Sequence, residues 1–283
     1  MKTAIIILNY NDYETTSNML NNIRNYKSID LIVVVDNKSI DDSYNKLKKF
    51  ENNKIKIIQT NENKGYAYGN NYGLMYLKNK NIDYVIISNP DIIVEENVII
   101  KLKEDLNNKD ITLVAPIIIE NNHLSRGWKL PKFREDLISN INYFHKYSEK
   151  LLNYKDDKYN QQLVKVDVVS GCFFAIKYQD FKNIDFFDSN TFLYYEENII
   201  GKKLQDINKN SYIDTTIKAK HNLSVSVSKS LNSLKKYKIL KNSQIYYEKE
   251  YNNLNILGII LLRITYYISY FISFLMIKLS RRK

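Results

Sequence analysis

Cysteine is scarce in this sequence. The 283 residues contain one, Cys172. A lone cysteine excludes a disulfide within the chain and a zinc site built from several thiolates. It is typical of a protein in a reducing compartment, and we interpret Cys172 as a small residue of the core.

The first residues lack the pattern of a signal peptide. The opening segment MKTAIIILNYND has a short apolar run, from Thr3 to Leu8. The hydrophobic region of a signal peptide has roughly 7 to 15 residues and is followed by a small-residue cleavage site. We therefore expect this run to be the first strand of a cytoplasmic protein.

Net charge is nearly absent from residues 1–200, which sum to −1, although the whole chain carries +11. Residues 201–283 contain sixteen Lys or Arg and four Asp or Glu. This basic segment coincides with the longest apolar stretch, rather than with aromatic platforms for stacking bases. The pattern argues against nucleic-acid binding and favours an anionic membrane surface as partner.

The apolar stretch, residues 256–277, has one charged side chain, Arg263. Its length permits a membrane span, which takes about 20 residues. An arginine in hydrocarbon costs on the order of 3 kcal/mol, however, and Tyr266, Tyr267 and Tyr270 favour the membrane interface. Three interpretations stay open: a spanning helix, an interfacial or re-entrant helix pair, and a buried core helix.

The first hundred residues alternate apolar runs with polar helical patterns. The runs AIIIL, LIVVVD, KIKIIQT and YVIIS are separated by predicted helices at about 13–25, through SYNKLKKF, and near YGNNYGLMYLKN. Because Pro90 cannot donate to a ladder, the fourth strand should end near Ser88. The alternation predicts an α/β fold whose parallel sheet is covered on both faces.

Polar loops follow the predicted strands: NYND, DNKSIDD, NENKGYAYGNN and SNPD. Any one of them could be ordinary turn or cap chemistry. The carboxyl ends of parallel strands meet at one edge of a sheet, where α/β proteins bind ligands. Four such loops together predict a ligand site.

The second half begins with another predicted strand, ITLVAPIII, and a loop around Trp128. That loop either closes over a substrate or is a surface loop with one anchoring aromatic. Residues 136–162 suggest a helical insertion, and VKVDVVSGCFFAIKYQDFKNI predicts strand, break, strand and helix. The segment FFDSNTFLYY is expected to be an aromatic strand.

Two carboxylates, Glu196 and Glu197, follow that segment and begin a predicted helix. Acids in the first turn are stabilised by the helix dipole, which is the structural explanation. The functional alternative is a general base, held in a cleft to take a proton from a hydroxyl group.

Seven segments in this order resemble the family 2 glycosyltransferases: IIILNYND, VVVDNKSIDDS, NENKGYAYGNNYGL, ISNPDIIV, VSGCFFAIK, FLYYEENI and KHNLSVS. The similarity spans residues 3–226 and is greatest to the bacterial rhamnosyltransferase-like branch. It implies the GT-A fold, a mostly parallel central sheet flanked by helices, and inverting sugar transfer from a nucleotide-diphosphate donor linked to dTDP or UDP.

The resemblance also implies roles for particular residues. Asp36 would accept a hydrogen bond from the pyrimidine base of the donor, and Lys64 would contact the diphosphate. The substrate-binding residues, which include Trp128 from the loop argument above, are Asn9, Tyr10, Asp36, Asn37, Asn63, Lys64, Gly65, Asn70, Asn89 and Trp128. Asp91 would bind Mg²⁺ or Mn²⁺, with His221 completing the site, and Glu197 would be the base, with Glu196 as the alternative.

These expectations describe an enzyme in two parts. Residues 1–230 form the catalytic domain, with 1–110 as its nucleotide-binding half and 111–230 as its acceptor-binding half. Residues 231–283 form a helical membrane-associating segment. The acceptor would be a lipid-linked glycan of a bacterial surface polysaccharide at the cytoplasmic membrane face.

Two other functions stay open. The family has an acid where this chain has Ile199, which leaves a catalytically degenerate, membrane-bound binding or assembly subunit as an alternative. A nucleotidyltransferase is the second alternative. Such an enzyme would be expected to carry a glycine-rich basic phosphate loop after the first strand, where this sequence has NYNDYETT.

Overall fold

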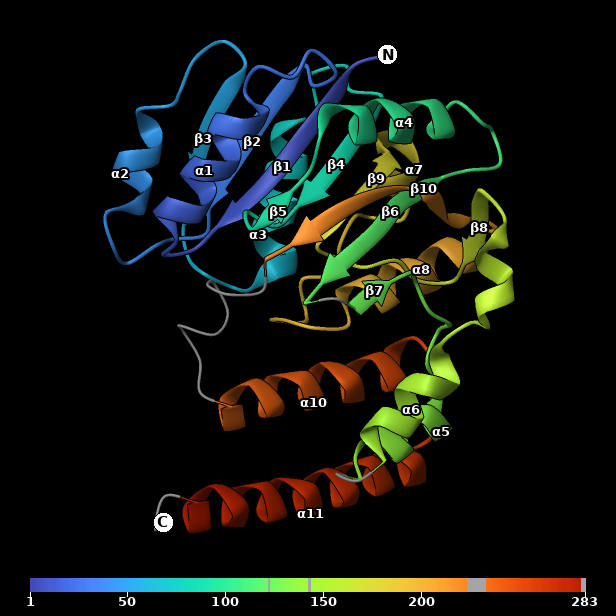
Figure 1. Ribbon diagram of the computed structural model, residues 1–283. Helices are drawn as coiled ribbons and strands as arrows, with labels where there is room; N and C mark the ends of the chain where they lie inside the picture. Colours follow the sequence, from blue (N-terminus) through green and yellow to red (C-terminus); the bar gives the residue numbers. More distant parts are fainter. Residues whose placement is uncertain (122, 142–143, 223–232, 281–283) are drawn as a thin grey trace.

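The computed structural model describes residues 1–121, 123–141, 144–222 and 233–280. Ten strands form one mixed sheet (Figure 1). They are β1 Thr3–Asn9, β2 Leu31–Asp36, β3 Ile55–Gln59, β4 Tyr84–Ser88, β5 Ile92–Ile93, β6 Leu113–Glu120, β7 His123–Ser125, β8 Leu163–Val166, β9 Phe173–Lys177 and β10 Ser211–His221. The end of β4 at Ser88 confirms the boundary predicted from Pro90.

The strand order is β3-β2-β1-β4-β9-β6-β10-β5, with β7 paired to β6 and β8 to β10. The first four of these strands are mutually parallel, and β6 and β10 are parallel to each other. Strand β9 is antiparallel to its neighbours β4 and β6. Because β2 and β4 lie on opposite sides of β1, the chain reverses its winding there, and α/β sheets bind ligands at such a point.

Helices cover both faces of this sheet (Figure 1). One face packs against α1 Tyr13–Ile23, α2 Ser43–Lys48 and α4 Glu96–Leu106. The other packs against α3 Tyr66–Tyr76, α7 Tyr178–Asn183 and α8 Glu196–Asp206. The predicted insertion forms α5 Phe133–Ser139, α6 His145–Leu152 and a 3₁₀ helix, Asp156–Asn160.

Strand β1 shows why the strand sequences are apolar throughout. Ile5 and Ile7 belong to the cluster on one face of the sheet, whereas Ala4 and Ile6 belong to the cluster on the other. All four side chains are fully buried. Since successive side chains of a strand point to opposite faces, a sheet covered on both sides needs apolar residues at every position. The α/β prediction is confirmed.

The aromatic strand predicted for residues 186–195 is wrong. The segment forms bends and turns, and φ is positive at Phe186 (51°), Tyr194 (74°) and Tyr195 (70°). These values lie in the left-handed region, which a strand does not contain. Phe186 and Phe187 are buried against the sheet cluster, so tertiary packing accounts for the aromatic residues here.

The C-terminal residues form α10 Ser233–Glu250 and α11 Ile256–Ser280. The apolar stretch is one uninterrupted helix, so the interpretation as a re-entrant pair is wrong. Among the described residues, α11 alone is long and apolar enough to cross a membrane, which by itself is weak evidence. Most of its side chains are exposed, which does not fit a core helix. Residues 223–226 of KHNLSVS and the proposed boundary after residue 230 lie outside the described residues.

Candidate active site

A cavity of about 740 Å³ opens at the carboxyl ends of the central strands. Residues from the loops after β1, β2, β3 and β4 line it together with the start of α8 and the end of β10. Nine of the predicted site residues are in its wall: Tyr10, Asn37, Asn63, Gly65, Asn89, Asp91, Glu196, Glu197 and His221. The convergence of loops predicted from the sequence is therefore present in the structure.

Asp36 lies at the end of β2, is fully buried, and is not in the described cavity wall. Its Oδ1 accepts hydrogen bonds from Ser39 N at 3.0 Å and Gln59 Nε2 at 2.9 Å. Its Oδ2 accepts from Asn9 Nδ2 at 2.8 Å and Ser39 Oγ at 2.6 Å. Asp36 and Asn9 thus stabilise the loops after β1 and β2 by hydrogen bonds. Their contact with a pyrimidine base stays a prediction.

The loop after β3 is tied to the turn before α8. Asn37 donates from Nδ2 to Asn63 Oδ1 and to the carbonyl of Gly65, both at 3.0 Å. Gly65 has a φ of +102°, and a Cβ there would lie 2.0 Å from the carbonyl oxygen of Phe192. Tyr66 N donates to that oxygen at 2.9 Å. Glycine is thus required where the two loops meet.

Three further predicted residues are not in the described wall of the cavity. Lys64 is more than half exposed and pairs with Glu62. Asn70 is buried in α3 and donates to the carbonyl of Tyr66 at 3.1 Å. Trp128 donates from its indole nitrogen to Asn198 Oδ1 at 2.9 Å, and its backbone pairs with Val168. Trp128 is an anchor between its loop and α8, and its contact with substrate stays a prediction.

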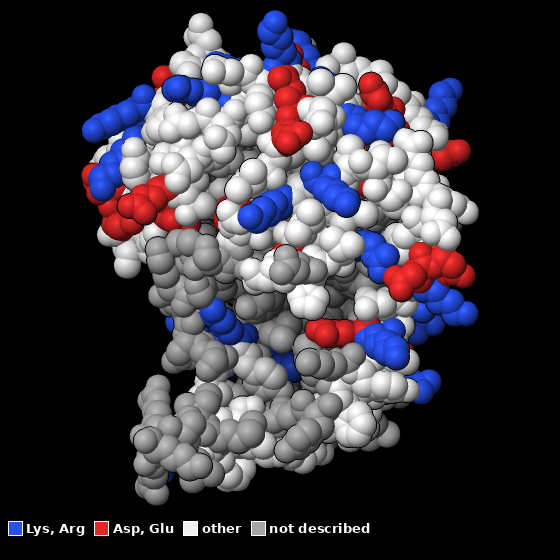
Figure 2. Space-filling model, in the orientation of Figure 1, with Lys and Arg blue, Asp and Glu red and all other residues white. Residues whose placement is uncertain are grey.

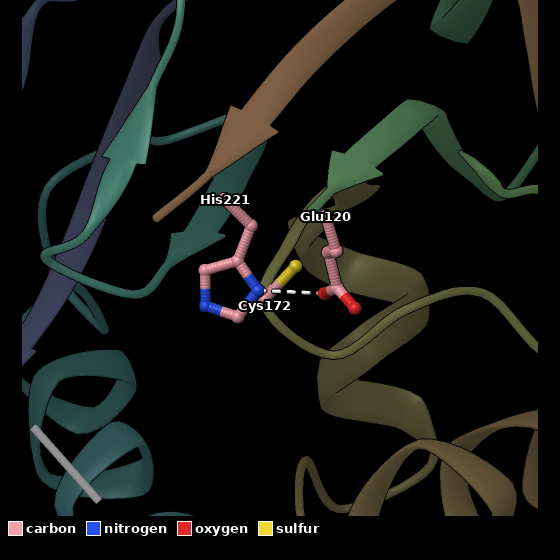
Figure 3. A group of neighbouring side chains, drawn as sticks. All are labelled: Glu120, Cys172 and His221. Carbon is pink, nitrogen blue, oxygen red and sulfur yellow. Dashed lines mark hydrogen bonds and ion pairs between the residues drawn. The ribbon is translucent and has the colours of Figure 1, made fainter. Parts of the chain in front are cut away.

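His221 lies at the end of β10 among three possible metal ligands. Its Nδ1 is 2.6 Å from Glu120 Oε1, and its Nε2 is 3.1 Å from Asp91 Oδ1. The ligand atoms of Glu120, Cys172 and His221 all lie within 4.8 Å of one another (Figure 3). Burial lowers the pKa of His221, but its contacts with Asp91, Cys172 and Glu120 outweigh burial and raise it to about 12.

These residues fit a divalent cation. Asp91 Oδ1 is buried and, despite its distance to His221, receives no hydrogen bond with acceptable direction. A buried carboxylate oxygen without a donor is costly, and a cation would satisfy it. The carboxylates of Asp91 and Glu120 are hard oxygen ligands, which suit Mg²⁺ and Mn²⁺, and imidazole is tolerated by Mn²⁺. The soft thiol of Cys172 does not suit either ion.

Glu196 and Glu197 enter the cavity from the first turn of α8. Burial, followed by repulsion from Glu197, raises the pKa of Glu196 to about 8. Burial also raises the pKa of Glu197. A carboxylate with a pKa close to the working pH is an effective general base, so this pair can accept a proton inside the cavity.

The turn that carries these acids is held by two other helices. Tyr195 donates to Asp136 Oδ1 of α5 at 2.6 Å and receives a hydrogen bond from Gln244 Nε2 of α10 at 3.2 Å. Ser243 of α10 donates to the carbonyl of Leu193 at 2.8 Å. Ile199 packs with Tyr195 in a buried cluster and is not in the described cavity wall.

Sequence reasoning missed other residues of the cavity wall, above all Glu120 and Cys172. Glu120 ends β6, so the rule that selected Asp91, a carboxylate at the carboxyl end of a strand, could have found it. Cys172 precedes β9, whose position between β4 and β6 is not visible in the sequence. Its interpretation as a core residue agrees with its burial but omitted its position beside His221.

The sequence matches the family described as glycosyl transferase family 2 over residues 4–185. No curated protein matches it. Many solved structures share its fold. GalNAc-T7 with UDP, GalNAc and Mn²⁺ has a TM-score of 0.62 and 15% identity, over 89% of this chain and 49% of that one. This chain thus spans about half the length of GalNAc-T7.

Two microbial structures are also similar. The mannosyltransferase PcManGT from Pyrobaculum calidifontis, in complex with GDP-Man and Mn²⁺, has a TM-score of 0.60 and 11% identity, over 94% of this chain and 69% of that one. S. aureus TarS 1-349 in complex with UDP-GlcNAc has a TM-score of 0.59 and 13% identity, over 96% and 73%. At these identities, the likeness shows a shared GT-A fold.

Proposed function

Because the chain belongs to glycosyl transferase family 2, we propose that it is an inverting enzyme that transfers one sugar from a nucleotide-diphosphate donor to a lipid-linked glycan. The observation that carries the proposal is the cavity itself. It brings Asp91, whose Oδ1 receives no well-directed hydrogen bond, to the same wall as the acid pair Glu196 and Glu197. Structures of the same fold with bound nucleotide sugars or UDP support a donor of this class.

Asp91 and His221 are the residues that would hold Mg²⁺ or Mn²⁺. A bound cation would neutralise the charge that develops on the departing diphosphate. Glu120 would fix the orientation of His221 through Nδ1, so that Nε2 faces Asp91. The sugars and Mn²⁺ named for GalNAc-T7 and PcManGT make a metal-assisted donor site reasonable for this chain.

Glu197 would act as the general base. It would take the proton of an acceptor hydroxyl while that oxygen bonds to the anomeric carbon from the face opposite the nucleotide. The bond from the anomeric carbon to the diphosphate oxygen would break, and the nucleoside diphosphate would leave with the bonding electrons. The configuration at that carbon would be inverted.

The donor sugar and the acceptor are proposed from features of the sequence. Rhamnose is favoured by the similarity to one branch of the family, with dTDP or UDP as the nucleotide. A lipid-linked acceptor is favoured by the basic, apolar C-terminal residues, because an enzyme held at the membrane meets such an acceptor at high effective concentration. The proposed location is the cytoplasmic face of a bacterial membrane.

A degenerate binding subunit remains the second candidate because Ile199 stands where the family has an acid. The buried position of Ile199 beside Tyr195 weakens this argument, since an acid there would not enter the described cavity wall without rearrangement. Metal-dependent nucleotide binding without any turnover would favour the degenerate subunit.

The first test is a thermal-shift panel of nucleotides and nucleotide sugars, with and without Mn²⁺, on the wild type and Asp91→Ala. We expect one nucleotide family to raise the melting temperature only with Mn²⁺, and Asp91→Ala to remove this effect. Glu104→Gln is the matched control because its carboxylate is exposed on α4 and outside the described cavity wall. Absence of a shift with every nucleotide would contradict the proposal.

Glu197→Gln tests the base. This variant should retain the metal-dependent nucleotide shift and lose sugar transfer, because it keeps the shape of the side chain and removes its basicity. Loss of donor binding in Glu197→Gln would show that the residue holds the donor instead.

A further inference from the structure

Helix α11 has one buried stripe and a wide exposed apolar face. The stripe consists of Ile259, Leu262, Tyr266 and Ser269, spaced three or four residues apart. The large apolar side chains exposed by 40 to 72% are Ile256, Leu257, Ile260, Leu261, Ile264, Tyr267, Ile268, Phe271, Ile272, Phe274 and Leu275. We call this set the apolar face. A continuous exposed surface of this kind marks an interaction site.

The buried stripe packs along α10 and the end of α5. The ring of Tyr237 in α10 lies 5.8 Å from that of Tyr266 and 6.5 Å from that of Tyr270. Asn140, just after α5, donates to Thr265 Oγ1 at 3.0 Å and to the carbonyl of Leu262 at 3.3 Å. Figure 1 shows α11 lying alongside α10, on the side away from the sheet. Helix α11 is thus held along its length by contacts with α10 and with Asn140 at the end of α5.

A second apolar surface lies beside α11. Ile141, Phe144 and Tyr147 follow α5 and are exposed by 44 to 51%. Ile141 directly follows Asn140, the residue bonded to α11, and Phe144 and Tyr147 lie four and seven residues after it. Figure 2 shows that Lys, Arg, Asp and Glu side chains are scattered over the upper part of the molecule, which contains the sheet.

The charges favour a lipid surface over a protein partner. Residues 252–283 include no Asp or Glu and five Lys or Arg. Arg263 and Lys278 are both exposed on α11. Long basic side chains at the border of an apolar helical face reach the headgroups of anionic lipids, and tyrosine is favoured at the same depth.

Helix α10 argues against a membrane span. It carries Lys238, Lys249 and Glu250 at exposed positions beside the packed part of α11. A spanning α11 would either draw these charges into hydrocarbon or give up its contacts with α10 and α5. A helix that lies in the plane of the membrane interface keeps its contacts with α10 and α5, and its apolar face is buried in lipid.

We propose that α11 lies in the plane of an anionic lipid bilayer on one side of the membrane, with Ile141, Phe144 and Tyr147 as a second insertion point. The inference refines the membrane attachment in the proposed function and rests on it. It also places the cavity close to the lipid surface, because Lys235 and Lys236 of α10 line the cavity and α10 lies between the cavity and α11. A lipid-linked acceptor would then reach the cavity along the start of α10.

The geometry is tested with thiol labelling of the full chain in membranes. Lys278→Cys places a reactive thiol near the end of α11, and Lys249→Cys is the matched control on α10; the native Cys172 is buried. In inverted membrane vesicles, a membrane-impermeant maleimide should label both variants. Labelling of Lys278→Cys only from the opposite side would show a span and overturn the proposal.

The second insertion point has its own test with purified protein and vesicles. Phosphatidylcholine vesicles with phosphatidylglycerol should bind the wild type, and Phe144→Glu and Phe271→Glu should each weaken binding by about tenfold or more. Met75→Glu is the control, because Met75 is an exposed apolar residue of α3 on the catalytic body. Unchanged vesicle binding by Phe144→Glu would overturn the second insertion point. If the protein forms oligomers and does not bind vesicles, the proposal that the apolar face binds lipid would be overturned. Nucleotide shifts measured in parallel report on the catalytic function separately.

Discussion

Gly65 joins two loops that are far apart in the sequence. Its positive φ and the close approach of Phe192 leave no space for a side chain. Glu120, another single residue, holds one nitrogen of His221 and leaves the other facing Asp91. At the scale of single residues, the candidate site therefore depends on Gly65, which joins two of its loops, and on Glu120, which orients the candidate metal ligand His221.

Gly65→Ala should destabilise the protein by about 2 kcal/mol or more, because the variant combines left-handed strain with a backbone clash. The free energy of urea unfolding measures the loss. Gly171→Ala is the control, since a Cβ there meets Glu197 at an ordinary 3.5 Å. Equal stability of the two variants would contradict the assigned role of Gly65.

Glu120→Gln should weaken Mn²⁺ binding by roughly 10- to 100-fold, the usual effect of losing a carboxylate that orients a ligating histidine. The measurement is a titration with Mn²⁺ followed by electron paramagnetic resonance of the free ion. Glu104→Gln, an exposed carboxylate of α4, should bind as the wild type does. An unchanged affinity in Glu120→Gln would mean that His221 is not a ligand oriented by this residue.

At the scale of elements, α8 presents its acids in a geometry set by α5 and α10. The turn before α8 cannot be held by its own backbone alone, since Tyr194 and Tyr195 are both in the left-handed region. Hydrogen bonds from Tyr195, Ser243 and Gln244 fix it across helix boundaries. Helix α10 therefore supports Glu196 and Glu197 as well as α11.

Tyr195→Phe should lower turnover by about tenfold while leaving the KM of the donor nearly unchanged, because a small displacement of a base affects the transition state most. The assay is release of nucleoside diphosphate from the nucleotide sugar that gives the largest thermal shift. Tyr178→Phe is the control, since its hydroxyl bonds the carbonyl of Leu74 within the core. A rise in KM alone would contradict the positioning role.

At the scale of the whole molecule, several buried carboxyl groups have raised pKa values. Burial is the main cause for each: the pKa is about 7 for Asp105, about 6 for Asp136, and about 8 for Glu196 and Glu248. Their unfolded values are close to 4. The folded state therefore binds more protons than the unfolded chain between about pH 4 and pH 8, and its stability falls as pH rises through this interval.

The free energy of unfolding should accordingly be higher at pH 5 than at pH 8. Asp105→Asn should reduce this difference by about 1 to 2 kcal/mol, because it removes one group that must lose a proton in a buried site. Urea unfolding at both pH values provides the measurement. Asp206→Asn, which alters an exposed ion pair, should leave the difference unchanged. A larger difference in Asp105→Asn would contradict the assignment.

The sequence by itself determined the α/β architecture, because apolar runs without alternation occur in strands covered on both faces. It also placed part of the cavity wall, since polar residues after parallel strands converge at one edge of the sheet. Asp91 was predicted in this way, Glu197 and His221 were implied by the resemblance to the family 2 glycosyltransferases, and the structure brings all three to one cavity.

Tertiary structure alone decided the rest. The position of β9 beside β6, and so of Cys172 beside Glu120, depends on strand order, which no local pattern encodes. The turn at 194–195 is left-handed because distant helices bind it, although its aromatic sequence favours a strand. Helix α11 has the composition of a membrane span, but its contacts with α10 and α5 fix its direction. In each case contacts between residues far apart in the chain outweigh local preference.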